Sequence, residues 1–314
     1  MNKITLNIKG VSQWFGDNRV LHDINIKVVQ GQFVALVGES GCGKSTLLRA
    51  ILGTLPPKEG IIETDGIPVT GPNHNVGVVY QHYDLYDWMT AEENVAFGLK
   101  LHETDIRDRL FKYFSWRKLR NQHLEQSRDM LSKFRLTNSH DRYPVELSGG
   151  MKQRVAIAQA LIMKPKILLL DEPFGALDEA TREELQGTLL MLYAENMEAR
   201  KRGEPPPWTV MMITHELDEA FYVSDRVIGL SRRWHDGDLK GPELGATKVW
   251  DKCSPVYHPD DERDFTKFHD AKEELRNEVI KGSRIMQREE NCSFWSDLQN
   301  GVGSGVAFTK NSHV

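Results

Sequence analysis

The sequence predicts an α/β fold, with a parallel sheet sandwiched by helices, an antiparallel β subdomain at the N-terminus and an inserted α-helical subdomain. Three observations support this class. Continuous apolar runs, typical of strands buried on both faces, occur at 33–37, 76–80, 167–170 and 210–213. Helix-compatible stretches separate these runs, as crossover connections between parallel strands require. The first residues of the chain follow a different pattern, in which apolar and polar residues alternate.

The alternating N-terminal segment predicts half-buried strands. Ile4, Leu6 and Ile8 are separated by polar residues, which is the period of a strand with one buried face. Short runs of the same kind follow at 24–29 and 61–69, and Gly and Pro turns separate them. We expect these strands to pair as an antiparallel sheet.

The middle of the chain predicts the helical insertion. Between about Ala91 and Pro144 the strand signals vanish, so we place a helical subdomain at about 91–150. Its segment 111–120, FKYFSWRKLR, interleaves basic and aromatic residues. Such a segment could contact lipid headgroups or a membrane protein, but an amphipathic helix with a solvated basic face is the commoner meaning of the pattern.

The composition changes near residue 232, where we place a boundary between one large domain, 1–232, and an extension, 233–314. Before it, the polar, proline-containing stretch 200–207 is predicted to be a surface loop. The extension is charged and loop-rich, with one helix predicted at about 265–280. Its apolar residues near one face are Phe265, Phe268, Leu275 and Val279. The last ~20 residues are rich in Gly, Ser and Asn, as mobile termini often are.

Composition excludes several classes of protein. A net charge of −5 argues against general nucleic-acid binding. No apolar run reaches the ~18 residues of a membrane-spanning helix, and the opening MNKITLNIKG lacks the apolar core of a signal peptide. Three cysteines do not make a disulfide framework, which favours a reducing cytoplasm. The set Cys253, His258, His269 and Cys292 matches no compact zinc pattern.

A glycine-rich loop predicts the core of a P-loop NTPase. Gly38 and Gly43-Lys44-Ser45 have the spacing of a phosphate loop, between an apolar strand and a helix-compatible run. Backbone N–H groups and a helix N-terminus would surround the phosphates of ATP, Lys44 would reach the β- and γ-phosphates, and Ser45 would ligate Mg²⁺. The predicted nucleotide-binding residues of the loop are Gly38, Glu39, Ser40, Gly41, Cys42, Gly43, Lys44, Ser45 and Thr46.

Cys42 lies inside this loop, near the N-terminus of the predicted helix. The pKa of a thiol tends to fall in such a place, so alkylation of Cys42 is predicted to block ATP binding. The alternative is that Cys42 is a small filler residue.

Polar residues follow three of the buried strands. Asp171 and Glu172 end the run ILLL, and the sequence predicts Asp171 to face Mg²⁺ and Glu172 to orient the attacking water. His215 follows another buried run and could sense the γ-phosphate. Gln81 ends a third strand, and its amide could touch Mg²⁺ or the water in one state and withdraw in another.

The segment 147–154, LSGGMKQR, is not needed for nucleotide binding by a single P-loop chain. It would have a role if a second copy of the chain closes over the nucleotide. With this segment, the order of the motifs resembles that of ABC-transporter ATPase subunits: the P-loop, Gln81, LSGGMKQR, ILLLDEP, GALD at 175–178, and His215. The resemblance covers about residues 1–232. It implies an ATPase that works as a homodimer, or as a pseudo-dimer with a related ATPase.

The resemblance also assigns further residues. It implies that Ser148, Gly149 and Gly150 form part of the ATP site, with Ser148 and Gly150 contacting the γ-phosphate held by the opposite subunit. It implies that Asp178 lies where the two subunits communicate. Phe15 occupies the place of the aromatic residue that stacks on adenine, with Trp14 as a neighbouring candidate.

Two details resemble importers of the nitrate, sulfonate, taurine and bicarbonate group: DEPFGALD, and the pair of segments WMT at 88–90 and NVAFGL at 94–99. They imply uptake of a small solute through a separate membrane permease, an indirect partnership with a solute-binding protein, and a peripheral position on the cytoplasmic face of the inner membrane. The chain departs from that group at 81–84, 196–208 and after 232. The alternatives are an exporter or lipoprotein-release ATPase, a soluble ABC ATPase without a membrane partner, and a regulatory subunit that binds ATP without turning it over.

Overall fold

The computed structural model describes residues 3–103, 113–175, 177–254, 265–281 and 285–299. Its centre is a seven-stranded sheet in the order β14-β12-β9-β3-β8-β7-β6. Five neighbouring strands of this sheet are parallel: β6 (Val76–Val79), β7 (Ile167–Asp171), β8 (Val210–Ile213), β3 (Phe33–Gly38) and β9 (Arg226–Ser231). The predicted parallel core is therefore confirmed.

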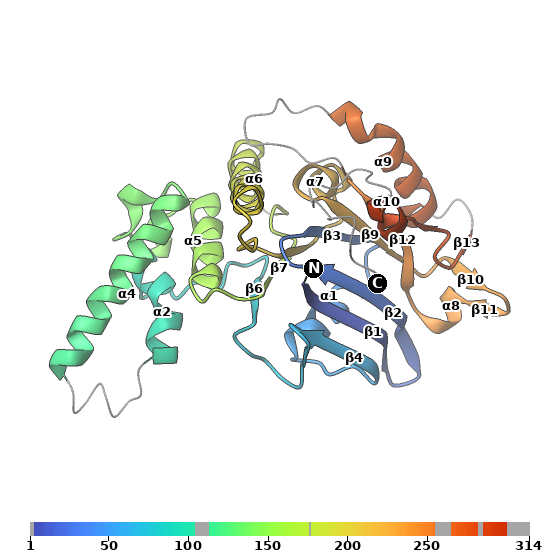
Figure 1. Ribbon diagram of the computed structural model, residues 1–314, viewed down its shortest axis with the longest axis horizontal. Coiled ribbons are helices and arrows are strands. Elements are labelled where there is room, and N and C mark those ends of the chain that lie inside the picture. The colour runs from blue at the N-terminus through green and yellow to red at the C-terminus, as the bar shows by residue number, and fades with distance from the viewer. Residues whose placement is uncertain (1–2, 104–112, 176, 255–264, 282–284, 300–314) are drawn as a thin grey trace.

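The two faces of this sheet have different covers (Figure 1). Phe33, Ala35 and Val37 of β3 pack with the helices α5 (Gly149–Leu161), α6 (Glu179–Lys201) and α7 (Leu217–Val223). Val34 and Leu36 point to the other face, where α1 (Lys44–Leu52) and an antiparallel sheet cover the strands. Alternate residues of one strand thus serve two separate cores, which explains why the run looks uniformly apolar in the sequence.

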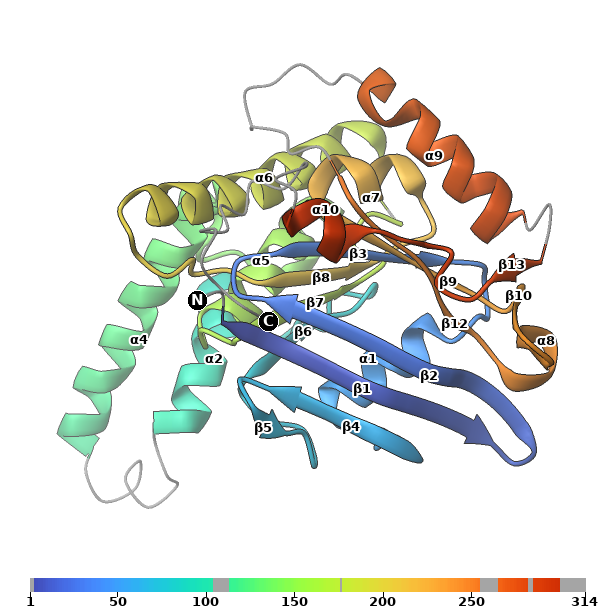
Figure 2. The ribbon, with the colours of Figure 1, turned by 45° about the vertical axis from the view of Figure 1, so that its right-hand side comes forward.

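The N-terminal antiparallel sheet is also confirmed. Its order is β2-β1-β4-β5. The strands are β1 (Ile4–Phe15), β2 (Asn18–Val29), β4 (Glu59–Thr64) and β5 (Ile67–Pro68). In Figure 2 this sheet passes in front of α1, and the buried residues of α1 pack with residues of both sheets.

The helical subdomain extends to one side of the sheet, as Figure 1 shows. It contains α2 (Ala91–Glu103), α4 (Tyr113–Lys133), two short 3₁₀ turns (Thr137–Ser139 and Pro144–Glu146) and α5. Part of the basic and aromatic segment lies outside the described residues. Its helical part begins at Tyr113, and Trp116 is half-buried.

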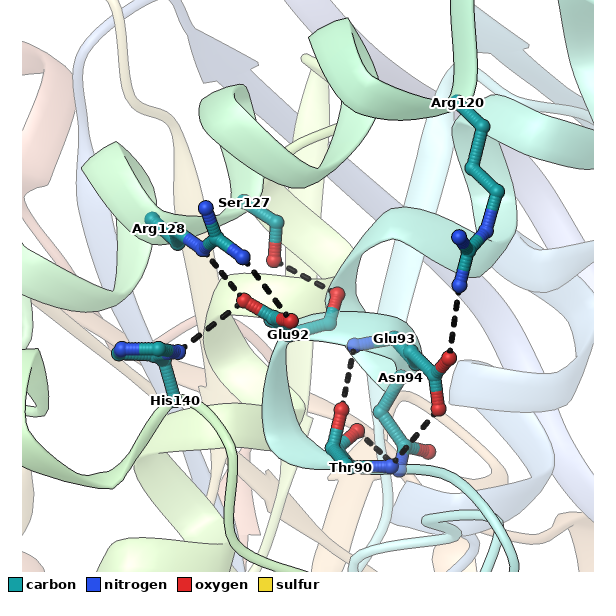
Figure 3. A network of polar contacts seen from close by, with 8 residues as sticks. All are labelled: Thr90, Glu92, Glu93, Asn94, Arg120, Ser127, Arg128 and His140. Carbon is teal, nitrogen blue, oxygen red and sulfur yellow. Dashed lines mark hydrogen bonds and ion pairs between the residues drawn. The ribbon is translucent and has the colours of Figure 1, made fainter. Parts of the chain in front are cut away.

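Glu92 of α2 holds this subdomain together (Figure 3). Its carboxylate accepts from Arg128 Nε at 2.6 Å and lies 3.1 Å from His140 Nδ1, while its carbonyl accepts from Ser127 Oγ at 2.7 Å. The same figure shows Thr90 and Glu93 capping the start of α2, with Glu93 N donating to Thr90 Oγ1 and Thr90 N donating to Glu93 Oε2.

The predicted loop at 200–207 begins later than expected, which corrects the sequence-based boundary. Helix α6 continues to Lys201, and Asn196, within the 196–208 insertion, is fully buried. Its Nδ2 donates to the carbonyls of Trp208 and Gly31, at 2.6 and 3.2 Å. Asn196 thus ties the loop that follows α6 to the turn that precedes β3. The 196–208 insertion therefore contains a buried residue as well as surface residues.

The segment after 232 contains more regular structure than its composition indicated. Its elements are β10 (Trp234–Asp236), β11 (Leu239–Lys240), α8 (Gly241–Leu244), β12 (Thr247–Cys253), β13 (Met286–Gln287), β14 (Asn291–Cys292) and α10 (Phe294–Gln299). β12 pairs antiparallel with β9 and extends the main sheet. The predicted helix is confirmed over Phe265–Ile280, as a 3₁₀ turn, α9 (His269–Leu275) and a π turn. Phe268, Leu275 and Val279 are buried on one face as predicted, and the side chain of Phe265 lies outside the described part.

Candidate nucleotide-binding site

The loop between β3 and α1 is shaped by its glycines. Gly43 has φ +104° and caps α1, and a Cβ at this position would lie 2.8 Å from side-chain atoms of both Val20 and Leu21. A larger residue would therefore be strained and would also collide with β2. The first N–H groups of a helix have no partner within the helix, and after a glycine-rich loop such groups commonly bind a phosphate.

Lys44 lies across this loop. Its Nζ atom donates to the carbonyls of Gly38 and Glu39, at 2.8 and 2.9 Å, and the residue is 6% exposed. These bonds hold the ammonium group beside the loop, where it can turn to phosphate oxygens at little cost in side-chain entropy.

Residues from distant parts of the sequence form one cavity beside the loop. Its volume is about 620 Å³. The residues that line it are Val20, Ser40, Gly41, Gly43, Lys44, Ser45, Thr46, Glu172 and His215. The cavity combines backbone groups of the loop, a lysine, three hydroxyls and an acid–imidazole pair, which suits a phosphorylated ligand and hydrolytic chemistry.

Three predicted loop residues, Gly38, Glu39 and Cys42, are not among the described residues that line the cavity. Gly38 is packed against the main sheet, because a Cβ there would lie 2.4 Å from the carbonyl oxygen of Leu230. Glu39 forms a 2.7 Å ion pair with Arg233, a residue that the sequence did not single out.

Asp171 ends strand β7 at the edge of the sheet that carries the loop, and Glu172 follows it. Asp171 pairs with Ile213 of β8, and Glu172 N donates to Ile213 O at 2.9 Å. Glu172 adopts a left-handed conformation with φ +47°, which is strained for a residue with a side chain. Burial, and next the negative charge of Glu172, raise the pKa of Asp171 above its ordinary value.

His215 and Gln81 both lie near Glu172. His215 Nδ1 is 3.2 Å from Glu172 Oε1. A Cβ placed on Gly175 would lie 3.3 Å from Gln81 Nε2 and 3.8 Å from Glu172 Oε2, so Gln81 is next to the turn that follows Glu172. Gln81 itself is exposed and is not among the described residues that line the cavity.

The LSGG segment forms a separate surface. Ser148 caps α5, accepting from Met151 N at 3.3 Å, and Gly149 and Gly150 begin the helix. A Cβ at Gly150 would lie 2.0 Å from Thr181 Cγ2, so this turn packs tightly on the start of α6. Among the described residues that line the loop cavity, none belongs to this turn.

Asp178 joins that surface from the next helix. It caps α6 by accepting from Thr181 N at 3.0 Å and from Thr181 Oγ1 at 3.0 Å, and these bonds lower its pKa. Its neighbour Ala176 lies outside the described residues. Because Gly150 touches Thr181, the caps of α5 and α6 form one continuous surface.

Phe15 is 51% exposed at the end of β1, where the chain turns into β2. Trp14 is less accessible and lies under Arg19, 5.5 Å from its guanidinium carbon. Phe15 is therefore the more available of the two aromatic rings for stacking on a base.

The expectation of a low thiol pKa at Cys42 is wrong. Cys42 is 2% exposed and packs in the core between the two sheets. Burial raises its pKa, and this effect exceeds the opposite influence of Lys44. The thiol therefore behaves as a small apolar core residue, and the filler alternative is the one that agrees with its burial.

The residues expected to hold Mg²⁺ offer oxygen donors. Ser45 supplies a hydroxyl, Asp171 a carboxylate and Gln81 an amide oxygen, which are ligands that Mg²⁺ accepts alongside phosphate and water. Within the described ranges, no group of three or more His, Cys, Asp or Glu residues could hold a metal by itself. This donor set fits an ion that is bound together with nucleotide phosphates.

Comparison with known proteins gives a consistent result. A family model described as "ABC transporter" matches residues 21–175. The aliphatic sulfonates import ATP-binding protein SsuB of Bacillus cereus is 38% identical over 234 residues, which cover 73% of this chain and 82% of the relative. The nitrate import ATP-binding protein NrtD of Synechocystis sp. is 42% identical over 213 residues, 68% of this chain and 71% of the relative.

A solved structure shares the same fold. It is a dimeric ATP-binding cassette in a post-hydrolysis state with bound ADP and Pi. It is 26% identical, with a TM-score of 0.58, and the alignment covers 80% of this chain and 100% of the other.

Proposed function

Because the chain belongs to the ABC transporter family of ATP-binding subunits, we propose that it is the ATP-hydrolysing subunit of an importer for a small solute. The observation that carries the proposal is the cavity in which Lys44 and Ser45 of the phosphate loop meet Glu172 and His215. The order of these groups along the chain supports hydrolysis of the γ-phosphate rather than nucleotide binding alone.

The roles of the residues follow from their places around the cavity. Backbone N–H groups at the start of α1 and the ammonium group of Lys44 bind the phosphates. Glu172 accepts hydrogen bonds from the attacking water and orients it in line with the bond that breaks. His215, 3.2 Å from Glu172, fixes that carboxylate and faces the same oxygens. Phe15 stacks on the base.

Mg²⁺, when bound, supplies positive charge to the β- and γ-phosphate oxygens. Ser45 and Asp171 would hold it, with the amide of Gln81 close enough to the Glu172 turn to join them in one state. Burial, and next the charge of Glu172, raise the pKa of Asp171, and a bound cation would favour its ionised form.

The separate LSGG surface supports a dimer. Ser148 caps α5 and is exposed together with Gly149, whereas Gly150 is buried. None of the three is among the described residues that line the cavity of its own subunit. In a head-to-tail pair, this turn would cover the triphosphate bound by the partner, so ATP would close the dimer and hydrolysis would release it. Asp178, on the same surface, would lie at the contact between the two subunits.

A groove beside Gln81 is suited to a segment of the membrane permease. It has a volume of about 430 Å³ and includes Tyr83, Tyr86, Phe97 and Met163. Asn94 fixes one wall, since its side chain bonds the backbone of Tyr86 at 2.8 and 3.1 Å. Any movement of α2 therefore moves the loop that follows Gln81.

The described residues contain no helix long and apolar enough to cross a membrane. We further propose a peripheral position on the cytoplasmic face, a separate permease as partner and, indirectly, a solute-binding protein, because the relatives are named as import ATP-binding proteins. The names of SsuB and NrtD, which refer to import of sulfonates and nitrate, support a small anion as the solute.

A purification from membranes tests this function. The tagged chain is expected to bring down a multispanning permease and to show Mg²⁺-dependent ATPase activity that Glu172→Gln abolishes. Recovery of the chain alone, with ATPase activity that does not respond to the permease, would contradict the importer. The solute is then identified from the binding protein that stimulates the complex.

A further inference from the structure

Glu219 of α7 is a buried acid that the mechanism above leaves without a role. It is 6% exposed and is not among the described residues that line the cavity. A buried carboxylate is costly unless it has partners, so its contacts indicate why it is there. They lead to two turns of the site.

The first contact fixes the backbone on both sides of His215. Thr214 Oγ1 donates to Glu219 Oε2 at 2.9 Å, and the same hydroxyl accepts from Glu216 N at 3.0 Å. Thr214 is 2% exposed, and its N–H donates to Leu36 O at 3.2 Å. The residues before and after His215 are thus held by one hydroxyl, whose orientation is set by Glu219.

The second contact leads to the α6 cap. Arg182 Nε lies 3.5 Å from Glu219 Oε1, at ion-pair distance. The Nη2 atom of Arg182 donates to the carbonyl of Leu177 at 3.4 Å, immediately before Asp178. Glu219 therefore lies between the turn that carries His215 and the turn that carries Asp178.

We propose that Glu219 is a positioning residue that holds His215 against Glu172 and ties this pair to the Asp178 turn through Arg182. This inference rests on the proposed function, because it assigns a role within the same ATPase site. According to this inference, the His215–Glu172 pair and the Asp178 turn, which faces the other subunit, move together.

The electrostatics of Glu219 agree with this position. Burial raises its pKa to about 7, against the opposing influences of Thr214, Arg182 and His215, while Glu216 adds to the rise. A carboxyl group with such a pKa gains or loses its charge easily near neutral pH. Closer approach of Arg182 favours the carboxylate, so a movement of the Asp178 turn would strengthen the bond to Thr214.

The test uses the full chain and compares variants of the two bonded residues. Glu219→Ala and Thr214→Val each remove the bond that orients the His215 loop. Glu219→Gln keeps an oxygen for Thr214 but removes the charge that faces Arg182, and Thr214→Ser restores the hydroxyl. Asp218→Asn is the control, because Asp218 lies on the same helix and its carboxylate pairs with Lys272 at 2.5 Å instead.

We expect kcat for ATP hydrolysis to fall on the order of 10- to 100-fold in Glu219→Ala and Thr214→Val, as small displacements of positioned groups do, with Mg-ATP affinity unchanged. Thr214→Ser and Asp218→Asn should remain near wild type. Glu219→Gln should lie between. In a His215→Ala background, Glu219→Ala should lower kcat by no more than about twofold, because both changes act on one interaction.

Two results would overturn the inference while wild-type ATPase activity is intact. One is an equal loss of kcat from Glu219→Ala with and without His215, which would show independent effects. The other is a loss of Mg-ATP affinity at constant kcat. If Glu219→Ala does not fold, the contrast between Thr214→Val and Thr214→Ser decides. Absence of ATPase activity in the wild-type chain would instead overturn the proposed function, and the inference with it.

Discussion

Nδ1 of His215 lies 3.2 Å from Oε1 of Glu172, although the two residues are far apart in the sequence. The parallel register of β7 and β8, in which Asp171 pairs with Ile213, brings the two turns together. The same edge of the sheet carries the loop that begins after β3. The geometry of the strands therefore places a carboxylate, an imidazole and a phosphate loop around one cavity.

We expect Glu172→Gln to retain ATP binding but to lower kcat on the order of 10²- to 10⁴-fold, because the carboxylate that orients water is lost. Without hydrolysis the closed dimer should accumulate. Light scattering at saturating Mg-ATP measures this directly. A variant that remains monomeric at saturating nucleotide would contradict the dimer.

Lys44→Ala should lose most of its affinity for ATP. Lys44 is the cation beside the loop, where Gly38 and Glu39 hold it, and nothing else described on the loop replaces its charge. Isothermal titration calorimetry measures the change, with Lys58→Ala, an exposed lysine, as the control. Unaltered binding by Lys44→Ala would show that the lysine does not contact the phosphates.

Asp171→Asn should raise the thermal stability of the protein while it abolishes Mg²⁺-dependent hydrolysis. The folded protein binds the Asp171 proton more tightly than the unfolded chain does, since burial raises its pKa. The ionised carboxylate therefore lowers the free energy of unfolding as pH rises through the interval between the ordinary and the raised pKa. Asn has no charge and avoids this cost.

Thermal melts of both proteins across a pH series check the Asp171 prediction. The difference in Tm should grow as pH rises and should vanish at acidic pH, where both states are protonated. A variant that is less stable than wild type at neutral pH would mean that the carboxylate is stabilised by a partner.

All three thiols should be unreactive in the folded protein. Cys42 is buried, and burial chiefly raises the pKa of Cys253 and of Cys292 to about 12 each. Iodoacetamide labelling followed by mass spectrometry should modify them only after denaturation. Rapid labelling of native Cys42, with ATP protection, would restore the abandoned view of a reactive loop thiol.

Asp251→Ala should lower the free energy of unfolding by about 3–5 kcal/mol, because it leaves the buried guanidinium of Arg226 without its charge partner. The two side chains are 0% and 1% exposed, and they join at 2.7 and 2.8 Å. Urea unfolding measures the loss. The control is Glu204→Ala, which breaks an exposed pair with Arg202 and should cost less than about 1 kcal/mol.

The Asp251 pair also predicts a pH dependence. Burial acts to raise the pKa of Asp251, but Arg226 and Lys248 together outweigh it and hold the pKa below its ordinary value. The pair therefore contributes stability above the ordinary pKa of aspartate, and this contribution disappears as pH falls through the lowered value. A wild-type unfolding free energy that stays constant across that interval, relative to the variant, would contradict this assignment.

Local patterns were sufficient for much of the fold. The alternation at Ile4, Leu6 and Ile8 located β1, and the apolar runs located β3, β6, β7 and β8. Strand β9 was not predicted because it begins with Arg226, and a charged residue in a sequence usually indicates an exposed position. Its partner Asp251 is distant along the chain, so no local window contains the reason for its burial.

Strand β12 was missed for the same reason. Lys248 and Asp251 make it look solvated, yet both are buried, and Trp250 is fully enclosed. In the site, a low pKa was expected for Cys42 because it lies near the N-terminus of a helix. Its side chain instead points into the core, and this burial raises the pKa. Glu219 and Arg233 contact residues that are distant in the sequence, and neither belongs to a sequence motif, so their contacts could not be predicted.

The most direct measurement is a structure of the Glu172→Gln dimer with Mg-ATP. The account predicts the hydroxyl of Ser148 and the N–H of Gly150 within hydrogen-bond distance of the γ-phosphate that the other subunit's P-loop binds. A fully occupied Mg-ATP complex in which Ser148 contacts no triphosphate from either subunit would contradict a nucleotide site completed by two chains.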